Sequence, residues 1–288
     1  MVYEKTTLTE IAENTPVYLD NSIFNEDLNF EERKKSPRFK NGLLDFGFSE
    51  RIGAAKKFSD IKYSALHRQE MFSKNLFNVI KNNDNITTTT EILNEYNIFL
   101  RHLDYKLLYL KRYSTKKHGD KEIKLKNILD SNNNLYYTLH SRNNKYPGID
   151  ILTNFIINNS MNISRDGLFI KKKKGVYHKD VSKGDAELIS YAIIDSFVNT
   201  RDTYILTSDL DLINILRNLS LRINQRQLPK GLVYLYPKAI TSIYFPGEND
   251  WTDKFGLRFM CNSREEYGDS VFSKPKKIIP YSVNNRIN

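Results

Sequence analysis

Four stretches of the sequence place carboxylates where an apolar run ends or a helix is expected to begin. The acids are Asp20 after PVYL, Glu91 and Glu95 after TTTT, Asp185 in KGDAELI, and Asp209 and Asp211 after YILTS. Carboxylates that gather at one place repel one another, so their pKa values rise unless a cation neutralises them. An all-oxygen cluster suits Mg²⁺ or Mn²⁺, which can activate water for attack on a phosphodiester. The pattern therefore predicts a divalent-metal site for phosphodiester hydrolysis.

The expected secondary structure would bring these acids together. Short apolar runs predict strands, and apolar residues at helical spacing predict helices, in alternation along much of the chain. We expect strands at 16–20, 85–89, 203–207, 231–237 and 239–245, and helices at 59–81, 90–110, 149–161, 184–200 and 209–219. Such alternation is typical of an α/β fold with parallel strands, whose ligands bind at the carboxyl ends of the strands.

Each acid also has a purely structural explanation. Asp20, Asp185 and Asp209 could cap a helix or interact with the positive end of its dipole. Glu91 fits a first-turn carboxylate and is the second choice to Glu95, which lies one helical turn later on the same face. The joint occurrence of the acids after strands and at helix starts favours the functional interpretation over a set of separate caps.

Composition restricts the class of protein. The chain carries 44 Lys and Arg against 34 Asp and Glu, a net charge of +10, which suits a polyanionic partner or a Lys-rich solvated surface. Cys261 is the only cysteine, which excludes an intrachain disulfide and indicates a reducing compartment. The five scattered histidines lack zinc-ligand spacing. With neither a signal peptide nor a membrane-length apolar run, we expect a cytoplasmic protein and no membrane partner.

The segments that carry the acids resemble a known family. LDNSIF at 19–24, TTTEILNE at 88–95, KGDAELISYAI at 183–193 and YILTSDLDL at 204–212 are similar to the four motifs of PIN-domain ribonucleases. The resemblance implies a three-layer α/β/α sandwich with a mainly parallel central sheet. It also implies that the acids bind Mg²⁺ or Mn²⁺ for hydrolysis of RNA by a metal-dependent endoribonuclease.

The resemblance assigns individual roles. Asp20 matches the first-strand aspartate, Glu95 the helix glutamate, Asp185 the aspartate of the third motif and Asp209 that of the T-x-D turn. These four would be the catalytic and metal-binding residues, with Asp211 as an extra metal ligand. A hydroxyl that supports the turn would come from Thr207 or Ser208.

The domain organisation departs from the compact bacterial toxins of the family, because this chain is longer. The separation of the motifs implies insertions at about 24–84 and 97–170 within a PIN-like domain over 1–245, followed by a C-terminal extension over 246–288. We therefore expect an enlarged member of the family rather than a minimal toxin. Segment 112–147 is expected to be a helical excursion with loops.

RNA is the expected partner. Within a loop expected over 171–180, four consecutive lysines are candidates for gripping phosphates: Lys171, Lys172, Lys173 and Lys174. PIN-like domains often pair, so a homodimer is a further expectation, as is a protein partner or antitoxin.

Two alternatives remain open: a catalytically silent PIN-like scaffold that binds RNA, and a structure-specific DNA nuclease of the flap-endonuclease type. A haloacid-dehalogenase-like phosphohydrolase is excluded, because Asn21-Ser22-Ile23 follows Asp20 in place of the D-x-D loop.

Overall fold

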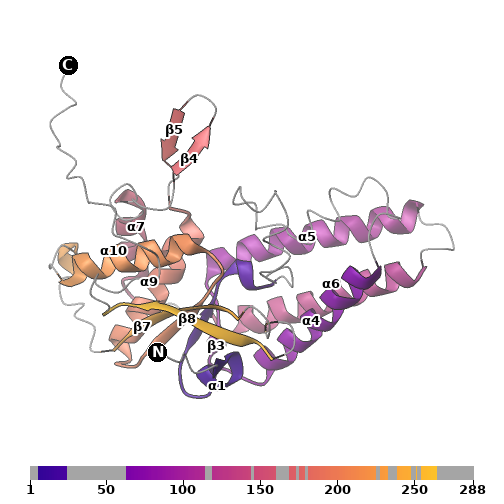
Figure 1. The fold of residues 1–288 in the computed structure, drawn as a ribbon, viewed down its shortest axis with the longest axis horizontal. Coiled ribbons are helices and arrows are strands. Elements are labelled where there is room, and N and C mark those ends of the chain that lie inside the picture. Colours follow the sequence, from indigo (N-terminus) through magenta and orange to yellow (C-terminus); the bar gives the residue numbers. More distant parts are fainter. Residues whose placement is uncertain are drawn as a thin grey trace.

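A six-stranded mixed sheet lies at the centre of the protein, with the strand order β1-β8-β7-β6-β2-β3 (Figure 1). The computed structural model describes residues 6–24, 63–113, 119–143, 146–159, 169–172, 175–178, 181–224, 228–232, 239–247, 251 and 254–264. The strands of the sheet are β1 (Thr6–Thr7), β2 (Val17–Leu19), β3 (Ile86–Thr87), β6 (Thr203–Leu206), β7 (Thr241–Pro246) and β8 (Gly256–Asn262). Together with the helices they make an α/β protein.

Helices connect and flank these strands. The described residues form seven α-helices: α1 (Leu8–Ala12), α4 (Tyr63–Lys81), α5 (Thr90–Tyr113), α6 (Gly119–Ser141), α7 (Ile149–Asn158), α9 (Lys183–Val198) and α10 (Leu210–Asn224). Two short 3₁₀ helices are η1 (Asn21–Phe24) and η7 (Lys230–Leu232), and a separate hairpin is formed by β4 (Phe169–Lys172) and β5 (Gly175–His178). None of the described helices has both the length and the apolar character that crossing a membrane requires.

The parallel part of the sheet fixes the positions of the acids. Strand β2 pairs in parallel with β3 on one side and with β6 on the other, and β6 pairs in parallel with β7. Leu19 of β2 lies opposite Leu206 of β6, and both are fully buried. The next residues, Asp20 and Thr207, therefore leave the sheet side by side at its carboxyl edge.

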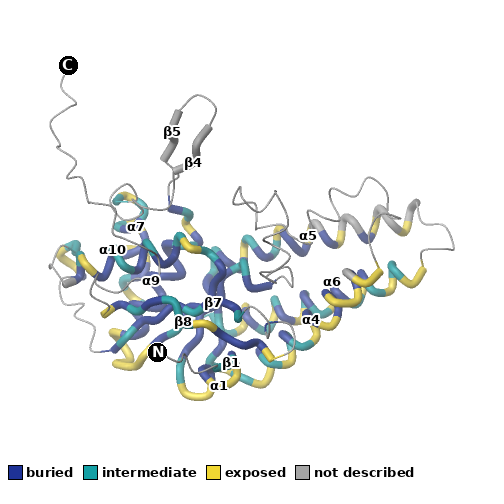
Figure 2. The backbone as a smooth tube through the Cα atoms, in the orientation of Figure 1, coloured by how far each residue is buried: buried dark blue, intermediate teal, exposed yellow. Residues whose placement is uncertain are grey.

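Three long helices extend together to one side of the sheet (Figure 1). Their inner faces are buried (Figure 2), and a chain of hydrogen bonds links all three. Asn132 of α6 donates to the Ser73 hydroxyl of α4 at 3.0 Å and accepts from the Tyr96 hydroxyl of α5 at 2.5 Å. Because buried polar groups need partners, these bonds favour one register of α4, α5 and α6.

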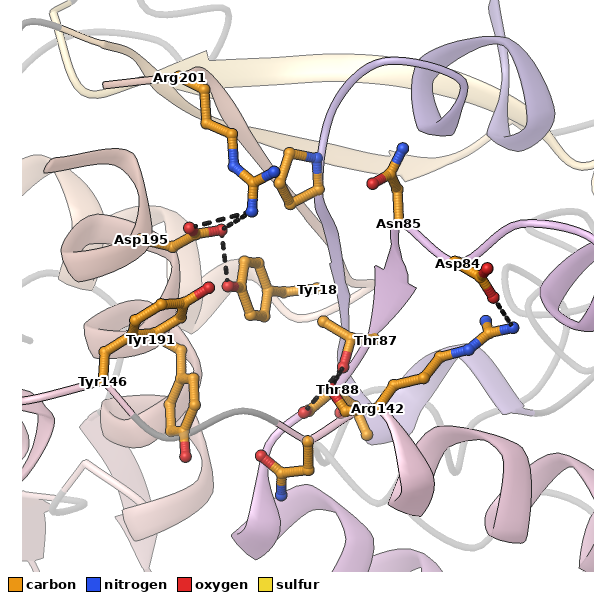
Figure 3. Close-up of a pocket in the computed structure, with 12 residues that line it drawn as sticks. Tyr18, Asp84, Asn85, Thr87, Thr88, Arg142, Tyr146, Tyr191, Asp195 and Arg201 are labelled. Atoms are coloured by element: carbon orange, nitrogen blue, oxygen red, sulfur yellow. Dashed lines mark hydrogen bonds and ion pairs between the residues drawn. The ribbon is translucent and has the colours of Figure 1, made fainter. Parts of the chain in front are cut away.

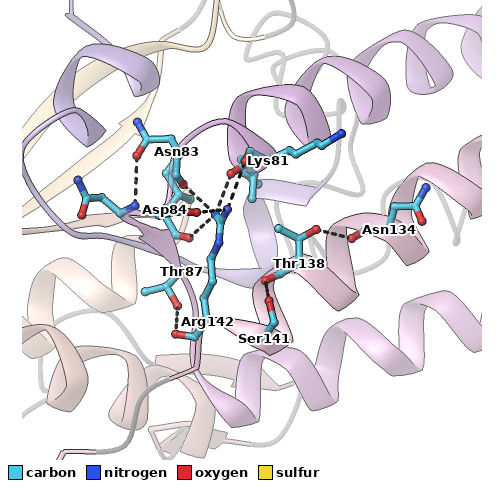
Figure 4. Close-up of polar contacts among 11 residues, drawn as sticks. Lys81, Asn83, Asp84, Thr87, Asn134, Thr138, Ser141 and Arg142 are labelled. Atoms are coloured by element: carbon cyan, nitrogen blue, oxygen red, sulfur yellow. Dashed lines mark hydrogen bonds and ion pairs between the residues drawn. The ribbon is translucent and has the colours of Figure 1, made fainter.

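Arg142 ties the end of α6 to the turn that precedes β3. Its guanidinium donates to the carbonyl oxygens of Ile80 and Asn83 at 2.7 and 2.8 Å and to the Asp84 carboxylate at 2.7 Å (Figure 4). The planar guanidinium offers several donors in a fixed arrangement, which suits this cluster of acceptors. Edge strand β3 is thus anchored to the three-helix arm.

Most expected elements near the acids are confirmed, and others are corrected. The sheet is mixed, since β8 pairs antiparallel with both β7 and β1. The expected loop over 171–180 is wrong where it contains β4 and β5, which pair as an antiparallel hairpin. The expected tail after Pro246 contains β8, whose weakly alternating sequence gave no signal of its pairing with β7.

Other expectations fall partly outside the described residues. Within the expected strand at 231–237, the structure shows η7 ending at Leu232, and the remainder is not described. Most of the expected insertion 24–84 before Tyr63 is likewise outside the described residues. The helical excursion at 112–147 is confirmed as α6, and the division into domains stays a prediction.

Candidate active site

The carboxylate of Asp20 is held at the end of β2 by two hydroxyl groups. Thr207 donates to Asp20 Oδ2 at 2.7 Å, and Ser22 donates to the same oxygen at 2.5 Å. The side chain of Asp20 is buried, and its backbone amide continues the sheet by donating to the Leu206 carbonyl at 3.0 Å. Both side-chain bonds end on one oxygen, which leaves the orientation of the carboxylate fixed.

The same two hydroxyls organise the turn that carries Asp209. The Thr207 hydroxyl accepts from the Asp209 amide at 2.9 Å, and the Ser22 hydroxyl accepts from the Ser208 amide at 3.0 Å. Asp209 in turn accepts from the Asp211 amide at 2.9 Å, so it caps the start of α10. One Thr and one Ser therefore fix the first-strand acid relative to the turn after β6.

Asp185 reaches the site from the first turn of α9. Ser182 caps this helix, and its hydroxyl accepts from the Asp185 amide at 3.0 Å. Burial raises the pKa of Asp185 well above its usual range, and the negative charges of Asp20 and Asp209 raise it further. The three carboxylates from β2, α9 and the turn after β6 thus lie within electrostatic reach of one another.

Burial is also the main influence on Asp20. It raises the pKa of Asp20 to about 6, and the charge of Asp209 adds to the rise, while the bonds from Ser22 and Thr207 oppose it. A carboxylate that is buried among other acids is held at a free-energy cost unless a proton or a cation neutralises it. The site therefore attracts positive charge.

The two glutamates of α5 have different surroundings. Glu95 accepts from the Asn21 side chain at 3.5 Å, and its charge contributes to the raised pKa of Asp185. Glu91, one turn earlier, forms an ion pair with Lys183 of α9. Glu95 thus faces the other acids, whereas the charge of Glu91 is partly neutralised by a lysine.

A glycine makes room for Glu95. A Cβ atom on Gly184 would lie 2.7 Å from Glu95 Oε1, closer than real Cβ contacts, and a tight 3.2 Å from the side chain of Ile92. The absence of a side chain at Gly184 lets α9 and α5 approach closely. Gly184 is the second residue of α9, and the close approach of α5 gives a packing reason for a glycine there.

The donor set has the chemistry that a hydrated divalent cation requires. Asp20, Asp185, Asp209 and Glu95 supply only oxygen atoms, and Mg²⁺ binds through one or two carboxylates while it keeps several waters. Ser208 adds a buried hydroxyl for which the described residues provide no hydrogen-bond partner. As they stand, the described side chains contain no group of three His, Cys, Asp or Glu that could hold a metal directly. The donor chemistry and the mutual repulsion fit a hydrated divalent cation better than a closed cage.

Asp211 and the basic segment are the remaining predicted site residues. Asp211 lies in the first turn of α10, and its role as an extra ligand stays a prediction. Lys171 and Lys172 lie in β4 of the hairpin rather than in the expected loop. Lys173 and Lys174 lie outside the described residues, so the structure does not place them. The role of all four lysines in gripping phosphates therefore stays a prediction.

Sequence reasoning missed Ser22 as the second hydroxyl on Asp20. An Asp-x-Ser sequence directly after a strand is a signal for such a local hydrogen bond, because a serine two residues on can reach back to the aspartate. Of the two residues expected to supply the hydroxyl that supports the turn, Thr207 accepts from the Asp209 amide with its hydroxyl, whereas Ser208 contributes its backbone amide to Ser22.

Comparison with known proteins gives no relative. The sequence matches no protein-family model and no curated protein, and the structure matches no solved structure.

Proposed function

We propose that the protein is a metal-dependent endoribonuclease of the PIN-like type. The observation that carries the proposal is the gathering of acids from separate segments. The Thr207 hydroxyl bonds both the Asp20 carboxylate and the Asp209 amide where the parallel strands β2 and β6 end, and the charges of Asp20 and Asp209 raise the pKa of Asp185 on α9. Caps that act independently would not need to share one location. The net charge of +10 supports a polyanionic substrate.

The chain's own residues would prepare the site for a cation. Asp20, Asp185, Asp209 and Glu95 would hold Mg²⁺ or Mn²⁺, which when bound activates water and neutralises the charge that develops on the phosphate. Thr207 and Ser22 would keep the Asp20 carboxylate in one orientation, so that little rearrangement accompanies binding. The described residues suggest no side chain as covalent nucleophile, and direct hydrolysis is the simplest route.

The test is cleavage of a labelled mixed RNA pool in Mn²⁺ and in EDTA. Asp209→Asn should abolish metal-dependent cleavage while the fold persists, because asparagine caps a helix as well as aspartate does and removes only the charge. Asp202→Asn is a matched control: Asp202 accepts from the Ile240 amide at 2.8 Å ahead of β6, at the opposite edge of the sheet, and asparagine keeps that bond. Cleavage by Asp209→Asn at the wild-type rate would refute the proposal.

The same assay separates the alternatives. A silent scaffold would bind RNA and cut nothing in Mg²⁺ or Mn²⁺. A DNA nuclease of the flap-endonuclease type would cut flap or single-stranded DNA in preference to the RNA pool. Either result, obtained with protein that is folded by circular dichroism, would replace the ribonuclease assignment.

A further inference from the structure

A polar cavity separate from the acids is lined by residues of α9, of β2 and β3, and of the segment that follows α6 (Figure 3). Its volume is about 70 Å³, and it opens over β2 and the edge strand β3. Tyr146 and Tyr191 form one side, and Thr87 and Arg142 form the other, with Tyr18 of β2 between them (Figure 3). The volume suits the edge of a flat group rather than a whole nucleotide.

The charged groups around the cavity are already paired. Asp195 accepts from the Tyr18 hydroxyl at 2.9 Å and pairs with Arg201 at 3.2 Å, and Arg142 bonds to Asp84 and to backbone carbonyls. The paired charges leave the cavity close to neutral. An isolated phosphate or ammonium group would find no counter-charge there, so the chemistry favours a neutral ligand.

One hydrogen-bond acceptor in the cavity wall remains open. The amide nitrogen of Asn143 donates to the Thr90 hydroxyl at 2.8 Å, but Oδ1 of Asn143 is buried and no donor among the described residues reaches it. A buried acceptor without a partner lowers stability, and a ligand with an N–H donor would satisfy it. The partly buried ring of Tyr146 offers a flat surface for such a ligand, whereas the ring of Tyr191 is buried.

The cavity is linked to the acids through β2 and α9. The Thr88 hydroxyl, at the cavity wall, donates to the carbonyl of Leu19 at 2.6 Å, and Leu19 directly precedes Asp20. Tyr191 lies on α9 beyond Asp185, about 9 Å along the helix axis at the usual rise per residue. The cavity and the acids are therefore joined by the Thr88–Leu19 bond and by one helix, α9.

We propose that this cavity binds the edge of an adenine or cytosine base of single-stranded RNA, with the exocyclic amino group donating to Oδ1 of Asn143. Adenine and cytosine carry an amino donor at the required edge, whereas uracil and guanine carry a keto oxygen at the equivalent position. Single-stranded RNA is bound by proteins through just this combination of aromatic surface and hydrogen bonds to base edges. The proposal rests on the proposed ribonuclease function and assigns it a base preference.

The experiment measures binding by fluorescence anisotropy in EDTA, where metal-dependent cleavage cannot occur. Labelled oligoadenylate is compared with the same oligonucleotide made of purine riboside, which lacks only the amino group. Oligoadenylate should bind at least about fivefold more tightly, the ratio that corresponds to one such hydrogen bond. Asn143→Leu should abolish the difference, and Asn143→Asp, which keeps the acceptor and can accept from Thr90, should retain it.

Two further variants keep the experiment interpretable if Asn143→Leu does not fold. Asn134→Leu on the exposed surface of α6 is the matched control and should behave like wild type. Tyr146→Leu should weaken both oligonucleotides equally, because it removes stacking surface without touching the acceptor. This variant gives a result even where Asn143→Leu does not fold.

The outcomes separate this proposal from the ribonuclease assignment. Equal binding of the two oligonucleotides, no binding of either, or a preference that survives Asn143→Leu would overturn the base pocket. Tighter binding of the purine riboside oligonucleotide than of oligoadenylate would overturn it as well. Metal-dependent cleavage without base preference would leave the nuclease standing and refute the pocket. Tighter binding of oligoadenylate in EDTA, together with no RNA cleavage in any metal, would support the base pocket and refute the nuclease.

Discussion

Replacement of Asp20 by asparagine should stabilise the protein above neutral pH in the absence of metal. Burial raises the pKa of Asp20 from 3.8 to about 6 in the folded state. One pKa unit corresponds to about 1.4 kcal/mol, so the ionised carboxylate destabilises the fold by about 3 kcal/mol. Asparagine is uncharged and still presents an oxygen that can accept from Thr207 and Ser22.

The direction of the pH dependence follows from the raised pKa. Below the unfolded value of 3.8, Asp20 is protonated in both states and the folded state has no penalty. As the pH rises through about 6, the folded protein must give up a proton that the unfolded chain has already lost, so stability falls. Relative to wild type, Asp20→Asn should therefore gain about 3 kcal/mol between about pH 4 and pH 8.

The assay is urea unfolding of both proteins in EDTA across this pH range. The difference between the two free energies of unfolding cancels the contributions of titrating groups far from Asp20. It includes the relief of Asp185, whose pKa the charge of Asp20 raises. Asp130→Asn, which changes an exposed aspartate on α6, is the control and should stay within about 0.5 kcal/mol of wild type. A difference between Asp20→Asn and wild type that is independent of pH would refute the burial of a charged Asp20.

Three further predictions address other parts of the structure. Thr207→Val keeps the shape of a fully buried residue but removes the hydroxyl that bonds the Asp20 carboxylate and the Asp209 amide. It should lower the free energy of unfolding measured in urea by about 2–4 kcal/mol, whereas Thr207→Ser should recover most of that loss. Gly184→Ala should displace Glu95 and reduce RNA cleavage more than about tenfold with little change in thermal midpoint; unchanged cleavage would remove Glu95 from the mechanism. Burial raises the pKa of Glu70, but hydrogen bonds from Lys124 and neighbouring donors outweigh it and lower the pKa to about 2. The free energy of unfolding of wild type should therefore exceed that of Glu70→Gln by its full amount above about pH 5, and by less as the pH falls toward 2. A difference in the free energy of unfolding that does not change with pH would contradict this.

The elements that carry the acids could be predicted because local signals agree there. An apolar run ends at Leu19, Ser182 begins α9 as a cap, and Thr207 begins the turn before α10. In each place the strand or helix propensity, the cap and the position of the acid point to one structure. The relative placement then follows from the rule that parallel strands share a carboxyl edge.

Features that depend on distant partners could not be predicted. Strand β8 has no strong alternation, and its pairing with β7 is set by the fold rather than by its own sequence. The cavity joins Asn143, Tyr18 and Tyr191, which come from three separate segments of the chain with no common spacing. Nor does any local signal show that Arg142 holds the turn before β3, because its acceptors are mostly backbone carbonyls.

The choice between Glu91 and Glu95 depends on the helix that packs beside them. Two glutamates four residues apart lie on the same face of a helix, so the sequence of α5 alone cannot say which one joins the acids. Helix α9 decides between them with two adjacent residues. Lys183 pairs with Glu91, and Gly184 leaves the space that Glu95 occupies.

Two substitutions in α9, Gly184→Ala and Lys183→Met, should reduce RNA cleavage to different extents. Gly184→Ala displaces Glu95 directly, whereas Lys183→Met only removes the partner of Glu91. Because Glu95 is the glutamate that faces the other acids, the first change should reduce RNA cleavage far more than the second. A larger loss of cleavage from Lys183→Met than from Gly184→Ala would therefore assign the catalytic role to Glu91.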